Sequence, residues 1–205
     1  MISTESIMSV SKSDLPAAAS ALQKEDIPQL VEWLALKDDS IRYQAFLLLK
    51  YRSLSSADVY PYWDIFRNKL RSDNSYQRSI GLMLIGENAN WDDENRMEDT
   101  IDEYLELLYD EKPVTIRQCI QALGSIASAK PGLNEKISSA LITFDLTAVK
   151  ETMRKLILQD ILNVLIIVRG GYRSEEIENF ILSALSGDIL DKKSKKQFET
   201  ALFRT

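Results

Sequence analysis

Arginines recur along the chain at a nearly constant interval. The series consists of Arg42, Arg78, Arg117 and Arg154, which are separated by 36, 39 and 37 residues. A guanidinium carries five N–H donors in a rigid planar fork that pairs with carboxylates and phosphates. An evenly spaced series can therefore form a basic stripe that holds such groups of a partner, or it can tie neighbouring parts of the fold together.

In the second arrangement each arginine pairs with an acid of the turn before it and links successive structural units. The acids at these turns are Asp39, Asp73 and Asp110. We expect such a structural ladder for Arg42, Arg117 and Arg154. We expect Arg78 to be the exception, because polar and aromatic residues surround it in the sequence.

A second group of side chains could form a recognition site. Its members are Tyr76, Arg78, Asn88, Trp91 and Asp92. In a helix that begins near residue 74, Arg78 and Asn88 fall on one face, and Trp91 and Asp92 follow in the next turn. Aromatic and arginine side chains are enriched at binding hot spots. The alternative is structural: the tryptophan packs under the turn, and Asp92 caps the next helix.

Negative charge is concentrated in one segment. Residues 87–111 hold eleven acids and one base, a net charge of −10, so the rest of the chain sums to +4 although the whole carries −6. Such a face can dock a basic partner and speed its association, or it can be a solvated helix surface. The acids are spread along a helix and not gathered in a loop, so they do not predict a metal site. Five candidates for the docking face are Glu98, Asp99, Asp102, Glu103 and Glu106.

Histidine is absent from the sequence, which excludes several classes of chemistry. A Ser-His-Asp triad, an HExxH zinc site and a histidine proton shuttle all need that residue. The one cysteine, Cys119, stands between Ile116 and Ile120, so we expect a buried thiol and neither a disulfide nor a metal ligand. We therefore expect no enzymatic activity, no cofactor and no resident metal.

Helical periodicity dominates the elements that must position these residues. Strand patterns are nearly absent, and five prolines and seven glycines punctuate the chain. We expect eleven helices. The apolar stripe of one of them consists of Met97, Ile101, Tyr104, Leu105 and Leu108.

The arginine series coincides with a repeat of about 37 residues, each a helix pair. The positions 12 and 8 residues before each arginine are apolar or aromatic in all four cases: Leu30 and Leu34, Phe66 and Leu70, Leu105 and Tyr109, Ile142 and Leu146. We expect one domain over residues 14–205, preceded by a disordered or loosely ordered segment, 1–13. Within the domain, 14–23 would be an N-terminal cap, and the helix pairs would occupy about 26–53, 57–90, 93–129, 133–169 and 174–203.

Two segments resemble the second helix of a HEAT repeat. They are Asp38-Asp-Ser-Ile-Arg-Tyr-Gln-Ala45, followed by Phe46-Leu-Leu-Leu49, and Val114-Thr-Ile-Arg-Gln-Cys-Ile-Gln-Ala-Leu-Gly124. A narrower similarity over 74–81, 88–92 and 110–119 is to a group of small uncharacterised bacterial HEAT-like proteins. The resemblance implies an all-α fold, a right-handed α-α superhelix of the HEAT/armadillo type. Its second helices would line a concave surface.

The repeats, the lack of catalytic motifs and the split charge favour a non-enzymatic interaction or scaffold module that binds a partner protein on its concave or acidic surface. The alternative is a DNA-binding repair protein, because alkylation-repair glycosylases resemble this architecture. Its aromatic, acidic and basic groups would be Trp63, Trp91, Asp92 and Arg78. A net charge of −6 opposes phosphate binding, so we expect a protein partner and not nucleic acid. The HEAT-like metal hydroxylases need histidine ligands, and their activity is excluded.

No run of about 18 apolar residues occurs, so we expect no membrane span. Residues 1–13 lack a basic start followed by an apolar block, which argues against a secretory signal. By elimination we expect a cytoplasmic protein.

Overall fold

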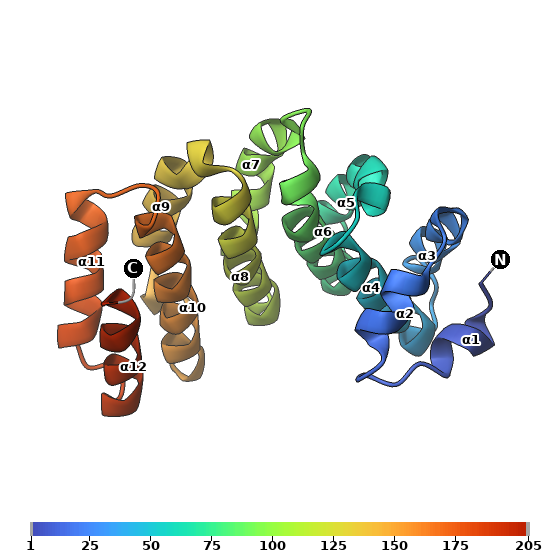
Figure 1. The fold of residues 1–205 in the computed structure, drawn as a ribbon. Coiled ribbons are helices and arrows are strands. Elements are labelled where there is room, and N and C mark those ends of the chain that lie inside the picture. Colours follow the sequence, from blue (N-terminus) through green and yellow to red (C-terminus); the bar gives the residue numbers. More distant parts are fainter. Residues whose placement is uncertain (1, 204–205) are drawn as a thin grey trace. The chain divides into compact units, whose positions relative to one another are not determined.

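The computed structural model describes residues 2–203, and this part of the chain is helical without a β-strand. Figure 1 shows helices joined by short connections along the chain. The α-helices are α1 (Thr4–Met8), α2 (Leu15–Ala21), α3 (Ile27–Trp33), α4 (Asp39–Ser53), α5 (Trp63–Leu70), α6 (Ser75–Asn88), α7 (Arg96–Glu106), α8 (Pro113–Ala129), α9 (Asn134–Ile142), α10 (Glu151–Arg169), α11 (Glu175–Ser186) and α12 (Lys192–Leu202).

Short 3-10 helices connect many of these elements. They are Lys24–Asp26, Ala57–Tyr62, Ala89–Trp91, Leu107–Tyr109, Pro131–Leu133 and Leu146–Ala148. The helix expected from residue 57 becomes a regular α-helix only at Trp63, because Pro61 lies inside the preceding turn and has no N–H to donate. The expected helix at 147 likewise begins at Glu151, after Val149 takes an extended conformation.

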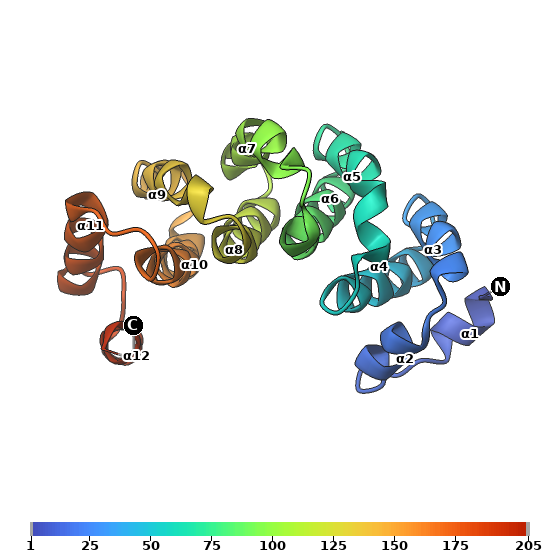
Figure 2. The same cartoon turned by 45° about the horizontal axis from the view of Figure 1, so that its top comes forward.

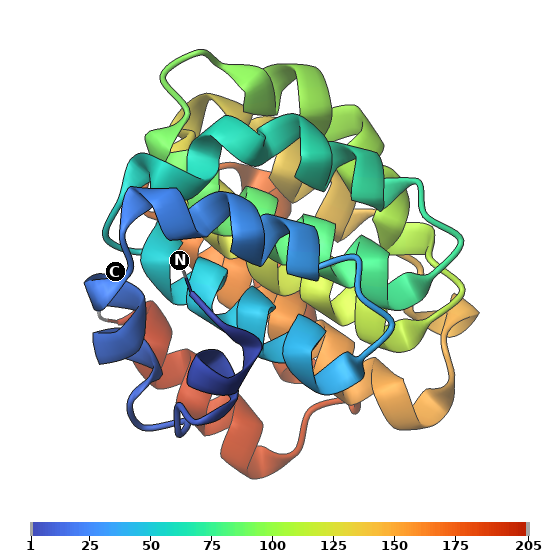
Figure 3. The ribbon, with the colours of Figure 1, turned by 90° about the vertical axis from the view of Figure 1, so that its right-hand side faces the viewer.

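The N-terminal segment differs from its expectation. Residues 1–13 were expected to be disordered or loosely ordered, but α1 occupies Thr4–Met8, where the Ser3 and Ser6 side chains form a capping box. Ile7 is buried, and the Gln44 amide of α4 donates 3.0 Å hydrogen bonds to the carbonyls of Ile7 and Val10. Both α1 and α2 pack on α4, near the blue end of Figure 3. The burial of Ile7 and the two hydrogen bonds from Gln44 therefore anchor a segment whose composition is mostly polar.

Contacts along the chain divide it into two compact units, Met1–Met97 and Glu98–Thr205, with the boundary inside α7. In the first unit α4 packs against α2, α3 and α6, and α5 packs along α6. In the second unit α8 packs along α10, and α10 also contacts α9, α11 and α12. Figure 2 shows these neighbours within each unit. A single solenoid domain over 14–205 remains a prediction.

The repeated apolar positions are buried in the first unit only. Leu30, Leu34, Phe66 and Leu70 are at most 3% exposed. At the matching offsets of the second unit, Leu105, Ile142 and Leu146 are half-buried and Tyr109 is 71% exposed. The buried residues there include Tyr104, Leu108 and Leu141. The second unit therefore keeps the helix pairs, but its buried positions lie about one residue earlier relative to the repeat arginine than those of the first unit.

Gly81 allows α5 and α6 to approach each other closely. A Cβ added at Gly81 would lie 2.6 Å from the Phe66 carbonyl oxygen, a backbone atom that cannot move without shifting α5. Gly124 of α8 is less restricted, since its nearest contact would be a side-chain methyl of Ile167 at 3.3 Å. The absence of a side chain at Gly81 is therefore a packing requirement.

We predict that Gly81→Ala lowers the free energy of unfolding by about 1–3 kcal/mol, because overpacking exceeds the helix propensity that alanine adds. Gly124→Ala is the matched control and should change it by less than about 1 kcal/mol, because a flexible side chain can yield. Denaturant unfolding followed by circular dichroism measures both variants. Equal stability of the two would contradict the packing argument.

Candidate functional site

The five residues of the predicted recognition cluster do not form one site. Tyr76 lies in the first turn of α6 and is 67% exposed. Asn88, at the other end of the same 14-residue helix, is fully buried, about 20 Å away along the axis. Arg78 and Asp92 are also buried, with 9% and 2% of their surfaces exposed. A partner can reach Tyr76 but not most of the group.

Asn88 and Trp91 are tied to the C-terminal end of α4. The Asn88 amide donates to the Ser53 hydroxyl at 2.9 Å and to the Leu84 carbonyl at 2.8 Å. The Trp91 indole donates to the Ser53 carbonyl at 2.6 Å. Both residues therefore join successive helix pairs, which is the structural alternative considered for this cluster.

Asp92 organises the start of α7. Its carboxylate accepts hydrogen bonds from the backbone N–H groups of Arg96 at 2.8 Å and Met97 at 2.9 Å, the first two residues of the helix. The Tyr60 hydroxyl donates to the same carboxylate at 2.8 Å. Asn95 takes a left-handed conformation, with φ of 58°, so the helix begins three residues later than expected. The expected capping role of Asp92 is therefore observed, with a shifted helix start.

The pKa of Tyr60 is raised to about 12, first by burial and then by the hydrogen bond that its hydroxyl donates to Asp92. The neutral phenol is thus the form that the folded protein favours. Its contribution to stability is complete below the ordinary tyrosine pKa of 10.0 and is lost as pH rises from there toward 12.

We predict that Tyr60→Phe lowers the free energy of unfolding near neutral pH by about 1 kcal/mol, because Asp92 loses a donor. Above pH 10 the stability of the variant should also fall less steeply than that of the parent protein, because the variant lacks the Tyr60 hydroxyl. Tyr109→Phe, at an exposed tyrosine, is the control and should leave stability at neutral pH unchanged. Urea unfolding of each variant across this pH range is the measurement. Identical curves for Tyr60→Phe and the parent protein would contradict the assignment.

Three of the four arginines turn back to the loop before their own helix. The hydrogen bonds run from Arg42 to the Leu36 carbonyl at 3.0 Å, from Arg78 to the Ser72 carbonyl at 2.8 Å, and from Arg154 to the Val149 carbonyl at 3.3 Å. Guanidinium groups thus satisfy carbonyls of the connection within a helix pair. Arg154 forms no ion pair within the described part of the chain, although its charge contributes to the lowered pKa of Asp145 in the preceding turn.

Arg42 and Arg117 do connect successive helix pairs. Arg42 pairs with Asp39 at 2.5 Å, and its guanidinium lies 5.8 Å from the centre of the Tyr76 ring on α6. Arg117 differs from the expectation that it would pair with Asp110 of the preceding turn. Its partner is Asp160 of α10, which lies 43 residues further on.

The Arg117–Asp160 ion pair joins α8 and α10 and is buried on the aspartate side, while the Arg117 side chain is 30% exposed. The Arg117 Nε and Nη2 atoms donate to the two Asp160 carboxylate oxygens at 2.6 and 3.3 Å, and Gln121 adds a bond of 3.0 Å. The Asp160 side chain is 8% exposed. Breaking such a pair leaves a donor or acceptor uncompensated.

We predict that Asp160→Asn lowers the free energy of unfolding by about 1–3 kcal/mol, because charge-assisted hydrogen bonds to Arg117 are lost. Asp102→Asn is the matched control. Asp102 pairs with Lys136 at 2.5 Å but is 80% exposed, so its loss should cost less than about 1 kcal/mol. Thermal and denaturant unfolding measure both variants. An equal loss of unfolding free energy in the two would contradict a larger contribution of the Arg117–Asp160 pair.

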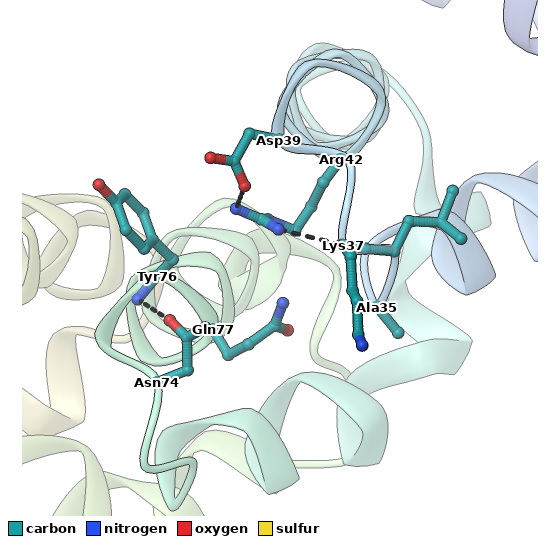
Figure 4. A pocket seen from close by; sticks show the side chains of 8 residues that line it. Ala35, Lys37, Asp39, Arg42, Asn74, Tyr76 and Gln77 are labelled. Atoms are coloured by element: carbon teal, nitrogen blue, oxygen red, sulfur yellow. Dashed lines mark hydrogen bonds and ion pairs between the residues drawn. The ribbon is translucent and has the colours of Figure 1, made fainter.

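A polar pocket opens where α4 and α6 begin. Its volume is about 540 Å³. Figure 4 shows Arg42 and Asp39 on one side of it, and Tyr76, Asn74 and Gln77 on the other. Sequence reasoning placed Arg42 and Tyr76 in two different groups and did not predict this pocket. The lining consists of Ala35, Leu36, Lys37, Asp39, Arg42, Asn74, Tyr76 and Gln77.

The acids of α7 lie mainly at the surface. Glu98, Asp99, Asp102 and Glu106 are exposed, and Glu103 is half-buried. Asp102 pairs with Lys136 of α9. In the described part of the chain, Glu98 and Glu106 have no ion-pair partner. The expected acidic face is thus solvent-accessible, and whether it docks a partner remains a prediction.

The remaining sequence expectations concern single residues. Cys119 is fully buried, as expected, and burial raises the pKa of its thiol. Trp63 and Phe66 are core residues. Among residues 2–203 no group of three or more acidic or cysteine side chains has a metal-binding arrangement, and no helix has the length and apolarity to cross a membrane.

Comparison with solved structures identifies the fold. A designed armadillo repeat protein in complex with the peptide (KR)4 matches with a TM-score of 0.63 and 14% identity, over 98% of this chain and 97% of that one. A second designed armadillo repeat protein matches with a TM-score of 0.59 and 15% identity, over 98% and 97%. An engineered protein from a structural genomics consortium matches with a TM-score of 0.60 and 18% identity, over 99% and 98%. No family model and no curated protein matches the chain.

These likenesses establish the fold class. The chain is an all-α protein with a HEAT/armadillo-like solenoid fold, as its repeats predicted. At these levels of sequence identity they establish the fold alone.

Proposed function

We propose that the protein is a non-enzymatic interaction module that binds a basic segment of a partner protein on the acidic face of α7. The observation that carries this proposal is the row of exposed carboxylates formed by Glu98, Asp99, Asp102 and Glu106. Lysine and arginine side chains of a partner would complement this row and would be drawn to it from a distance.

Repulsion within α7 favours such a partner. Glu98 and Asp102, and likewise Asp102 and Glu106, are four residues apart, so their carboxylates are neighbours on the helix surface. Like charges at this spacing destabilise a helix. Lys136 relieves the repulsion only at Asp102, and a basic segment would relieve it at the flanking positions as well.

The designed armadillo protein offers a parallel, because it forms a complex with the basic peptide (KR)4. That complex supports the compatibility of the architecture with a short basic segment. We extend the proposal to a cytoplasmic setting, in agreement with the expectation from the sequence.

No observation favours the DNA-repair alternative. Trp63 and Asp92 would have to face a substrate, but they are 1% and 2% exposed. Asp92 is also engaged with the first turn of α7, and the acidic face would repel a phosphate backbone.

The proposal predicts that Glu98→Gln/Glu106→Gln weakens binding of a peptide of four Lys-Arg repeats about fivefold, because two surface ion pairs are lost. Fluorescence anisotropy of the labelled peptide at low salt measures the dissociation constant. The salt dependence should also become shallower in the variant. Its melting temperature should change little, because the relief of repulsion offsets the interaction that Glu98 loses with the N-terminus of α7.

Asp188→Asn/Glu199→Gln is the matched control. Both residues are exposed, lie in the same compact unit and lack ion-pair partners in the described part of the chain. This variant has the same net charge as the α7 variant, and its affinity should change by less than about twofold. If both double variants weaken binding equally, the attraction is general and the proposed face is wrong.

A further inference from the structure

The pocket at the start of α4 and α6 contains an arginine with unused donors. The Arg42 side chain is 11% exposed, so its guanidinium lies in the pocket wall and not on the open surface. It donates to the Leu36 carbonyl through Nη1 and to Asp39 through Nη2. Because a guanidinium has five N–H groups, donors remain for a further acceptor.

Positive charge exceeds negative charge around this arginine. Lys37 also lines the pocket, and Asp39 is the one carboxylate in the lining. Lys69 of α5 donates a hydrogen bond to the side-chain oxygen of Gln77, which is a neutral amide and not an acid. Burial lowers the pKa of Lys69, and the charge of Arg42 lowers it further. An anion in the pocket would reduce this repulsion.

The existing partner of Arg42 is easily replaced. Asp39 is 82% exposed, so water screens its ion pair with Arg42 and hydrates the carboxylate if the pair opens. Asp38, its neighbour, is committed to the backbone N–H groups of Ser40 and Ile41 at the start of α4. Asp39 lies in the first turn of α4 and keeps its favourable interaction with the helix N-terminus when an incoming carboxylate replaces it at Arg42.

Tyr76 gives the pocket a second kind of contact. Its ring stands beside the Arg42 guanidinium and is 67% exposed, so a ligand can lie against it. Gln77 is held in place by its hydrogen bond to the Leu34 carbonyl at 2.8 Å. The Gln77 side chain thus forms a fixed part of the pocket wall on the α6 side. Ala35 and Leu36 add apolar carbon atoms to the lining. A volume of about 540 Å³ can hold an amino-acid side chain with its flanking backbone.

We propose that this pocket binds the side-chain carboxylate of an aspartate or glutamate in a partner polypeptide. The guanidinium of Arg42 would receive the carboxylate in place of Asp39. Lys37 would supply the second positive charge, and Tyr76 would pack against the side-chain carbons. The site lies in the first compact unit and is independent of the acidic face of α7, which would attract ligands of the opposite charge.

The test uses the full chain and short N-acetylated, C-amidated peptides that contain two glutamates between glycines. A second peptide has glutamine in place of glutamate, and a third is the glutamine peptide with a free C-terminal carboxylate. Fluorescence anisotropy at low salt should show binding of the glutamate peptide only. Equal binding of the glutamine peptide, or preference for the free C-terminus, would overturn the proposal.

Asp39→Asn separates this proposal from a purely structural role of Arg42. The change removes the competing carboxylate and should tighten binding of the glutamate peptide about threefold. Asp64→Asn is the matched control: Asp64 is 78% exposed, also pairs with an arginine and lies in the same compact unit. It should change affinity by less than about 1.5-fold. Equal effects of the two variants would contradict the site.

Loss of the cations should act in the opposite direction. Arg42→Gln should weaken binding at least about tenfold, because charge-assisted hydrogen bonds are lost. Lys37→Gln should weaken it about twofold to threefold. Arg42→Gln also removes a bond to the Leu36 carbonyl, so circular dichroism must show that it remains folded, while Lys37 is exposed and its variant tests the site without that risk. Unchanged affinity in Lys37→Gln and Asp39→Asn would overturn the proposal.

Discussion

A helix pair has more apolar surface than its two helices can cover for each other, so each pair depends on the next one for burial. In the first unit this constraint places α5 and α6 at a distance where Gly81 has no room for a side chain. In the second unit α8 and α10 meet around buried residues such as Leu123, Ile161 and Leu165. The close packing of neighbouring helices therefore determines which side chains are used in the core and which remain at the surface for binding.

Many polar groups that could have formed a binding site serve these junctions. Asn88 and Trp91 bind Ser53 at the end of α4, and Arg117 binds Asp160 across the α8–α10 contact. A buried polar group is costly unless it is paired, which explains why each of these side chains has a specific partner. The two surfaces proposed for binding, α7 and the Arg42 pocket, are those where charge is incompletely used within the fold.

The charged groups that the helix junctions do not use are separated by sign. Carboxylates accumulate on the outer face of α7, while Arg42, Lys37 and Lys69 gather where α4 and α6 begin. Under the two proposals, opposite signs at separate places would let one protein discriminate between basic and acidic segments. Such complementarity affects association rate and specificity more than it affects total affinity.

The sequence by itself determined the helical class, the pairing of helices, the buried thiol of Cys119 and the acidic segment, because periodicity and composition are local properties. The tertiary structure decided which partner each charged group finds. Arg117 binds Asp160 because two helices 43 residues apart in sequence meet there, and sequence spacing does not encode that contact. It also decided the face that each helix buries: Tyr109 occupies an apolar repeat position yet is exposed, while its neighbour Leu108 is buried. The pocket joins Arg42 and Tyr76 for the same reason, because neighbouring helix pairs bring their first turns together.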